Sequence, residues 1–258
     1  MTIPITDRLF QESARNAEEA RRLLVLGSRI LANEGVFDAF GHMSIRNPDN
    51  PNTFFMSRAI SPEMVTPDDL LELDFQGNIV AGNPNFKSFG ERPIHCAIYA
   101  KRPDVMSVCH PHPLALIPFA SSDIPLRSIY HQDITFSDGI PVFRDLPPEC
   151  GFLINTMELG YKLAEQLGER RGILIRNHGV VVVGESVART VYSCITLCDN
   201  AKALYHTLSM GAKNIDYIPR EAAQAGMQKQ FTFGLARSWG YWCMRVKNAY
   251  PEIADLAF

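Results

Sequence analysis

Two short motifs carry histidines that could bind one metal ion. His110 and His112 flank a proline after an apolar run, and His178 lies in an Asn-His-Gly turn between two further apolar runs. If residues 105–112 are extended, side chains two positions apart point to the same face, so both imidazoles can reach one ion. His178, on a neighbouring strand, would complete a three-histidine set with coordination positions left open for catalysis. Spacing alone leaves metal binding and coincidence as equal alternatives, because an isolated H-x-H pair is a weak signal.

A carboxylate precedes these histidines in the chain. Glu91 lies just before a helical pattern, in the segment Phe-Gly-Glu-Arg-Pro. On its own it is typical of the acidic residues that the helix dipole favours at an N-terminus. Beside a metal ion, the same carboxylate could act as a ligand or transfer a proton.

Composition restricts the class of protein and its partners: the chain has 258 residues, of which 46% are hydrophobic, enough for one large core. Lysine and arginine number 25 against 28 aspartates and glutamates, so there is no basic field to attract nucleic acid or an anionic membrane. No apolar run approaches the ~20 residues of a membrane-spanning helix, and residues 1–10 lack the apolar stretch of a signal peptide. The six cysteines form no C-x-x-C motif, which indicates reduced, buried side chains. We therefore expect a cytoplasmic protein whose partner is a small molecule.

The elements that must position these residues mix helices and short strands irregularly. Apolar periodicity predicts helices over 13–34, 92–102, 156–169, 185–211 and 220–246, and strands over 53–56, 70–75, 105–110, 172–176 and 180–183, with a hairpin turn at 76–78. Without strict alternation of strand and helix, this order indicates an α/β fold with a mostly antiparallel or mixed sheet. The chain shows no repeat or linker, so we predict a single domain over 1–258. The glycine-rich motifs that bind dinucleotides or nucleoside triphosphates are absent from the sequence.

Further short motifs accompany these residues in a fixed order. They are Gly41-His42-Met43-Ser44-Ile45-Arg46, Glu91-x-x-x-His95, Tyr99, Arg102-Pro103-Asp104, Val108-x-His110-x-His112 and Asn177-His178-Gly179, between an opening helix and a long later helix. This ordered set, from about Ala17 to Gly211, resembles the class II aldolase and adducin family. The resemblance strengthens the metal-site interpretation of the three histidines.

The resemblance implies a three-layer α/β/α fold with a central, mostly antiparallel sheet, followed here by a C-terminal helical extension over about 212–258. It also implies a homotetramer with active sites near subunit interfaces. In the family, the residues that match His110, His112 and His178 hold a divalent metal ion, commonly zinc or manganese, with iron or cobalt as alternatives. The residue that matches Glu91 is the catalytic acid/base. The adducins have lost parts of this set, so the presence of all four residues favours an enzyme.

The sequence departs from the family members that cleave sugar phosphates at each place where they hold phosphate. His42 replaces an asparagine, residues 57–62 contain no glycine, and Phe89-Gly90 replaces a pair of serines. A histidine at position 42, followed later by Ser-Arg-Ala, looks like the branch that decarboxylates hydroxylated aromatic or pyridine carboxylates. Aromatic side chains that could line a site for a flat ring are Phe37, Phe40, Phe86, Phe89 and Tyr130.

The predicted function is a metal-dependent, non-oxidative decarboxylase of a hydroxylated aromatic carboxylate or dicarboxylate, a lyase of aromatic compound catabolism. The metal ion would stabilise the carbanion or enolate, and Glu91 would protonate the ring carbon. Arg58, with Arg46 and Arg92 as rivals, would bind a second carboxylate, and His42 and His131 would hydrogen-bond the substrate. The alternatives are an aldolase acting on a non-phosphorylated hydroxy-keto acid, an adducin-like protein without catalysis, and an iron oxygenase.

Overall fold

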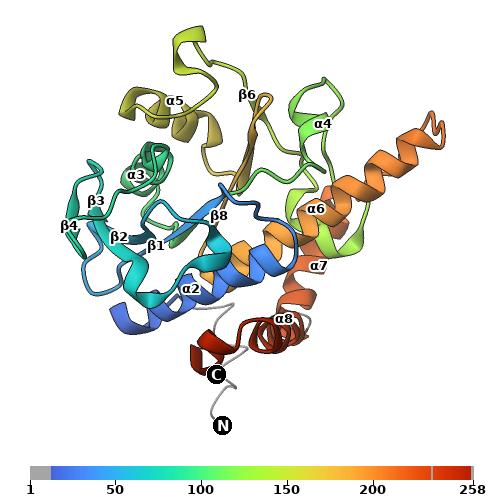
Figure 1. Cartoon of the computed structure of the whole chain (residues 1–258). Helices are drawn as coiled ribbons and strands as arrows, with labels where there is room; N and C mark the ends of the chain where they lie inside the picture. Colours follow the sequence, from blue (N-terminus) through green and yellow to red (C-terminus); the bar gives the residue numbers. More distant parts are fainter. Residues whose placement is uncertain (1–12, 234, 257–258) are drawn as a thin grey trace.

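An eight-stranded sheet forms the centre of the molecule in the computed structural model, which describes residues 13–233 and 235–256 (Figure 1). Its strands are β1 (His42–Arg46), β2 (Thr53–Ser57), β3 (Leu70–Asp74), β4 (Ile79–Ala81), β5 (Ser107–His110), β6 (Val142–Phe143), β7 (Gly172–Ile175) and β8 (Gly179–Gly184). They lie in the order β4-β3-β2-β1-β5-β8-β7-β6. Every neighbouring pair is antiparallel except β6 and β7, which are parallel. The predicted mostly antiparallel sheet is confirmed.

Helices cover both faces of this sheet. They are α2 (Ala17–Asn33), α3 (Arg92–Lys101), α4 (Ile117–Ala120), α5 (Met157–Leu167), α6 (Val187–Ser209), α7 (Arg220–Phe233) and α8 (Leu235–Ala249). Short 3-10 helices are η1 (Pro62–Met64), η2 (Pro67–Asp69), η3 (His131–Phe136), η4 (Pro148–Cys150) and η5 (Pro251–Leu256). Figure 1 shows α3 and α5 on one side of the sheet and α2, α6 and α8 on the other. The predicted three layers are therefore present.

Strand residues alternate between two hydrophobic cores because successive side chains of a strand point to opposite faces. On β8, Val180 and Val182 belong to the core under α2, α6 and α8, whereas Val181 and Val183 belong to the core under α3 and α5. All four side chains are buried. A strand with both faces covered reads as an unbroken valine run, which is what the sequence shows over 180–183.

Polar caps fix the starts of three helices. The side chain of Asn16 accepts the backbone N–H of Glu19, so α2 begins at Ala17 rather than at residue 13 as the apolar pattern predicted. Thr156 caps α5 and Ser186 caps α6 in the same way. The predicted helical stretch over 220–246 corresponds to α7 and α8, which lie on either side of residue 234, a position outside the described residues.

Two expectations about membranes and export have different outcomes. Within the described part of the chain, no helix combines the length and the apolar character that a membrane span requires. The predicted absence of a signal peptide concerns residues 1–10, which lie outside the described residues.

Candidate metal centre

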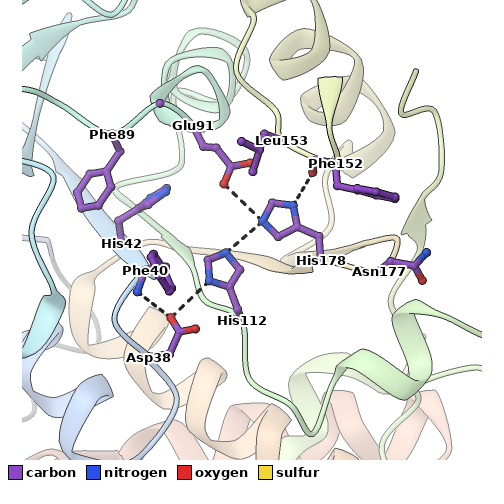
Figure 2. A pocket seen from close by; sticks show the side chains of 11 residues that line it. Asp38, Phe40, His42, Phe89, Glu91, His112, Phe152, Leu153, Asn177 and His178 are labelled. Atoms are coloured by element: carbon purple, nitrogen blue, oxygen red, sulfur yellow. Dashed lines mark hydrogen bonds and ion pairs between the residues drawn. The ribbon is translucent and has the colours of Figure 1, made fainter. Parts of the chain in front are cut away.

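The structure brings Glu91, His110, His112 and His178 together at one end of the central strands. His110 ends β5, His112 follows two residues later, His178 lies in the turn between β7 and β8, and Glu91 immediately precedes α3. One ligand atom from each of the four lies within 4.8 Å of the others. In Figure 2, Glu91, His178 and His112 follow one another along the pocket.

The distances among these atoms match a metal-binding set. Nε2 of His112 lies 3.2 Å from Nε2 of His110 and 3.1 Å from Nε2 of His178. Oε2 of Glu91 lies 3.5 Å from Nε2 of His110 and 3.4 Å from Nε2 of His178. Ligand atoms around a tetrahedral zinc ion with bonds of about 2.0–2.1 Å are about 3.3–3.4 Å apart. The four side chains therefore fit a divalent ion without rearrangement of the backbone.

In His110 and His178, the hydrogen bond of Nδ1 decides which ring nitrogen is left for a metal ion. Nδ1–H of His110 donates to the carbonyl of Val180 at 2.8 Å, and Nδ1–H of His178 donates to the carbonyl of Phe152 at 2.7 Å. A carbonyl oxygen only accepts, so the neutral rings carry their lone pairs on Nε2. These lone pairs converge on one point beside a carboxylate. That arrangement is repulsive unless a proton or a cation lies among them, which is the chemistry expected of a metal-ligand set.

Burial and mutual contact shift the pKa values of this cluster in the metal-free protein. Burial alone would raise the pKa of Glu91, but hydrogen bonding and proximity to His110 and His178 hold it well below its usual value. Burial would lower the pKa of His178, but contact with Glu91 raises it above 6.5. Burial and the two neighbouring imidazoles lower the pKa of His112 to about 4. Glu91 is therefore ionised and can accept a proton before it returns one.

The cluster opens into a cavity of about 510 Å³ with aromatic walls. Phe40, Phe89 and Phe152 line it together with Leu153, and Figure 2 shows these rings around the histidines. Phe40 and Phe152 are more than half exposed, at 73% and 52%, so the cavity has an open mouth. Its volume lies within the range of small-molecule sites. No lysine or arginine occurs among the described residues that line it.

Comparison with known proteins decides the family. Residues 22–205 match the family model of the class II aldolase and adducin N-terminal domain. Decarboxylase tropJ of Talaromyces stipitatus is 31% identical over 257 residues, which cover 90% of this chain and 97% of that protein. The chain belongs to the class II aldolase and adducin family.

A second curated relative and a solved structure are also similar to this chain. The 3,4-dihydroxyphthalate decarboxylase of Arthrobacter keyseri is 27% identical over 245 residues, covering 90% of this chain and 95% of that protein. The crystal structure of an aldolase II superfamily protein from Pseudomonas syringae superposes with a TM-score of 0.79 at 21% identity, covering 95% of this chain and 98% of that one. The former match and the family model identify the chain as a metal-dependent lyase, and the latter shows the shared fold.

Among the predicted substrate-binding residues, His42 is the one that the structure places in the lining of this cavity. His42 lines the cavity, with its ring centroid 4.5 Å from that of Phe89 and 5.2 Å from that of His110. It is buried, and burial followed by the proximity of His95 lowers its pKa well below 6.5. The ring is therefore neutral. Of the aromatic residues expected at the site, Phe40 and Phe89 line the cavity, whereas Phe37, Phe86 and Tyr130 do not.

Arg58 and His131 lie away from the cavity of this chain. Nε of Arg58 lies 2.7 Å from Oδ1 of Asp69, and its guanidinium stacks 4.9 Å from the centroid of Phe86. His131 begins η3 and is exposed, with its ring 5.2 Å from that of Tyr130. In this structure Arg58 is paired through Nε with Asp69 and does not line the cavity, and its role in binding substrate stays a prediction.

The rival arginines, Arg46 and Arg92, also lie outside the lining of the cavity. Arg46 donates to the carbonyls of Tyr99 and Arg102, and Arg92 donates to the carbonyls of Gly77 and Phe89. Each guanidinium therefore ties together backbone segments around α3, and neither lines the cavity.

Asp38 is a residue of the site that the sequence interpretation missed. Its Oδ1 accepts the backbone N–H groups of Phe40 and Gly41 at 2.9 and 3.1 Å, and lies 3.5 Å from Nδ1 of His112. Burial would raise the pKa of Asp38, but these two N–H groups and His112 lower it. A carboxylate behind a metal-binding histidine orients the ring and increases its basicity. The available signal was the Asp-Ala-Phe-Gly turn before β1, because an aspartate commonly closes such a turn onto backbone N–H groups.

Proposed function

We propose that this lyase removes a carboxyl group, without oxidation, from a hydroxylated aromatic acid. The observation that carries the proposal is the ionised Glu91 beside three converging imidazoles, at the base of a cavity with aromatic walls. The relatives named as decarboxylases support it. Flat rings pack well against Phe40, Phe89 and Phe152, whereas a polyol would leave its hydroxyl groups unpaired there.

His110, His112 and His178 would hold a divalent metal ion, for which zinc and manganese are our first candidates and iron and cobalt the others. When bound, such an ion supplies Lewis-acid stabilisation of negative charge on a substrate oxygen. The carbonyls of Val180 and Phe152 keep the rings of His110 and His178 turned so that Nε2 faces the ion.

Glu91 would move the one proton that the reaction needs. The substrate enters as a carboxylate with a hydroxyl group on the neighbouring ring carbon, and Glu91 accepts the hydroxyl proton. Glu91 then passes this proton to the ring carbon that bears the carboxylate, which gives a cyclohexadienone. The bond from that carbon to the carboxylate breaks, carbon dioxide leaves, and the electron pair passes through the ring to its oxygen, giving a phenolate that water protonates after release. The backbone N–H of Ile154, 2.8 Å from Oε1 of Glu91, holds the carboxylate in place throughout.

Charge at the cavity favours an acid with a single carboxylate. Two ionised carboxylates, Asp38 and Glu91, line it, whereas Arg58 lies outside the lining and is paired through Nε with Asp69. A second carboxylate on the substrate would therefore be desolvated without a cationic partner from the described residues of this chain. We infer that a hydroxybenzoate-type acid is preferred over its phthalate-type counterpart.

Product analysis by mass spectrometry tests both the metal-dependent decarboxylation and the preference for an acid with a single carboxylate. Zinc- or manganese-loaded protein is incubated with 2,3-dihydroxybenzoate and with 3,4-dihydroxyphthalate, which share a carboxylate next to a hydroxyl group. We expect kcat/KM for carbon dioxide release to be higher with the monoacid, 2,3-dihydroxybenzoate, than with the phthalate. After a chelator has removed the metal ion, we expect no release from either acid. Equal rates with and without chelator contradict the metal-dependent reaction, and a preference for the phthalate contradicts the charge argument.

Glu91→Gln isolates the proton step. The amide keeps the size of the side chain and can still accept the N–H of Ile154, but it cannot carry the proton. We expect kcat to fall by about 10²–10⁴-fold, the usual contribution of a general acid or base. Metal content, measured on the same samples, should show that the site remains occupied. Cleavage of hydroxy-keto acids with the ring acids untouched would identify an aldolase, and oxygen uptake would identify an oxygenase.

We also propose that the chain forms a homotetramer with active sites near the subunit interfaces. The apolar side chains of Phe40 and Phe152 line the cavity and are exposed, and a neighbouring subunit would cover them. Size-exclusion chromatography with light scattering measures the assembly directly. A monomer at micromolar concentration would contradict this proposal and leave the decarboxylase proposal intact.

A further inference from the structure

A line of four buried polar side chains runs from the cavity into the protein. Nδ1 of His42 lies 2.8 Å from Nε2 of His95, whose Nδ1 lies 2.6 Å from Oγ of Ser44. Oγ of Ser44 lies 2.8 Å from the hydroxyl oxygen of Tyr99. His42 and Ser44 are two residues apart on β1 and share one face, whereas His95 and Tyr99 are one turn apart on α3. None of the four is more than 3% exposed.

The four side chains carry more donor hydrogens than the three hydrogen bonds between them require. Burial keeps all four groups uncharged. Each then contributes one hydrogen that can be donated, an O–H from Tyr99 and from Ser44 and an N–H from each histidine. Three links need three hydrogens. The fourth must therefore point away from the line, from Tyr99, from Nε2 of His42, or from Ser44 if its oxygen accepts at both of its links. The Ser44 arrangement is unfavourable, because Ser44 is fully buried and the described residues show no further acceptor for its O–H. The spare hydrogen therefore lies at one of the two ends.

The surroundings of Tyr99 and His42 decide which of these two residues carries the spare hydrogen. Among the described residues, Oγ of Ser44 is the acceptor found for the Tyr99 hydroxyl, which is 1% exposed. If the line ran the other way, the O–H of Tyr99 would be buried without an acceptor, which carries a large desolvation cost. His42 instead lines the cavity, where water or a ligand can accept. The favourable order is therefore Tyr99 to Ser44 to His95 to His42, each donating to the next.

We propose that Tyr99, Ser44 and His95 are positioning residues that hold His42 as its Nε2–H tautomer, a neutral donor of one hydrogen bond into the cavity. The register pair His42–His110 places this donor beside the metal-binding set. It selects ligands that present an oxygen acceptor next to the metal-bound group, such as a carboxylate or phenolate oxygen, and disfavours an amine there. The inferred selectivity for ligands rests on the proposed function, whereas the inferred tautomer of His42 does not depend on it.

Neutron diffraction from deuterium-exchanged crystals of the zinc-loaded protein tests the tautomer directly. We expect deuterium on Nε2 of His42 and none on Nδ1. Deuterium on Nδ1 of His42 would overturn the proposal. Neither outcome depends on whether a ring acid is the substrate.

Two substitutions test whether the inner residues set the tautomer. In Ser44→Ala, the hydrogen bond between Nδ1 of His42 and Nε2 of His95 remains, and either ring can donate it. In both cases Nδ1 of His95 has no hydrogen-bond partner, so neither arrangement is favoured and His42 should populate both tautomers. In the matched control Tyr99→Phe, reversal would leave the Ser44 O–H unpaired, so His42 should keep Nε2–H. Nitrogen-15 spectra of histidine-labelled, zinc-loaded protein report both, with His42→Phe assigning the signal. An unchanged His42 signal in Ser44→Ala contradicts the positioning role, because a merely structural serine would leave the tautomer alone.

Binding of 2-hydroxybenzoate and 2-aminobenzoate to zinc-loaded protein tests the selectivity. We expect His42→Phe to weaken 2-hydroxybenzoate binding at least tenfold and to narrow its advantage over 2-aminobenzoate. Thermal melting and zinc content verify that the variant is folded and loaded. Unchanged affinities would refute the recognition role. A protein that binds 2-hydroxybenzoate through His42 but releases carbon dioxide from none of the acids would contradict the proposed function alone.

Discussion

Glu91 and His178 attract each other in the metal-free protein, and the pH dependence of its stability should show this. Its lowered pKa stabilises the fold above 4.5, and this contribution is lost as pH falls below that value. The raised pKa of His178 stabilises the fold at low pH, and this contribution is lost as pH rises through a value above 6.5. The attraction between the two residues is therefore complete only between these limits.

Thermal melting of chelated wild-type protein and of Glu91→Gln, from pH 4.5 to 9, measures this window. We expect the melting temperature of the wild type to exceed that of the variant most near pH 5–6.5, and the difference to shrink at higher pH. A difference that stays constant up to pH 9 would show that His178 is not the partner. With zinc bound the window should disappear, because the ion replaces the proton.

Asp38 should determine how well His112 binds metal. Asp38→Asn keeps an oxygen for the N–H groups of Phe40 and Gly41 but removes the charge behind His112. Loss of such an outer partner typically costs about 10–100-fold in metal affinity. Competition with a zinc-binding dye measures the affinity, and Asp123→Asn, which alters an exposed ion pair with Arg144, is the matched control. Equal affinities in both variants would remove Asp38 from the site.

At the scale of elements, Gly179 explains how the turn between β7 and β8 meets the end of β5. A Cβ atom at Gly179 would lie 2.5 Å from the carbonyl oxygen of Pro111 and 2.9 Å from Cδ2 of His112. The carbonyl of Pro111 cannot move aside easily, since Val180 N–H also donates to it. The close backbone approach is what brings His178 within reach of His112.

Gly179→Ala should therefore damage stability and the site together. Forcing an extra methyl group into close contact costs about 1–3 kcal/mol, and displacement of His112 should weaken zinc binding in the same variant. Gly240→Ala on α8 is the control, because its Cβ would meet nothing within 4 Å. Calorimetry and zinc titration give the two readouts. A variant that loses stability but keeps full zinc affinity would mean that the turn does not position His112.

Local patterns could predict most of these elements, but not the contacts between them. Valine runs, the histidine pair at the end of β5 and the turn before β8 are all visible within a few residues. The contact of His42 with His95 and His110 is not, because it depends on the register of β1 against β5 and on the docking of α3. The ion pair of Arg58 could not be predicted for the same reason: its partner Asp69 lies on η2, and only the fold shows that the two side chains meet.

At the scale of the molecule, the segment after residue 211 is part of the core rather than an appendage. On α8, Leu235, Trp239, Trp242, Cys243 and Val246 are buried. The ring of Trp242 lies 6.1 Å from that of Tyr192 on α6, and Arg245 pairs with Glu34 at 2.7 Å. This helix therefore completes the layer formed by α2 and α6.

A chain that ends at Gly211 should for this reason fail to fold cooperatively. Each large apolar side chain contributes roughly 1.5–3 kcal/mol when buried, and a domain has only about 5–15 kcal/mol in total. Near-ultraviolet circular dichroism during heating should show a sharp transition for the full chain and none for the shortened one. Trp242→Ala in the full chain separates packing from chain length, and should lower the unfolding free energy by about 3–5 kcal/mol. Were the shortened chain to melt sharply at the wild-type temperature, α7 and α8 would be an independent extension, and the sheet with α2, α3, α5 and α6 would suffice as the folding unit.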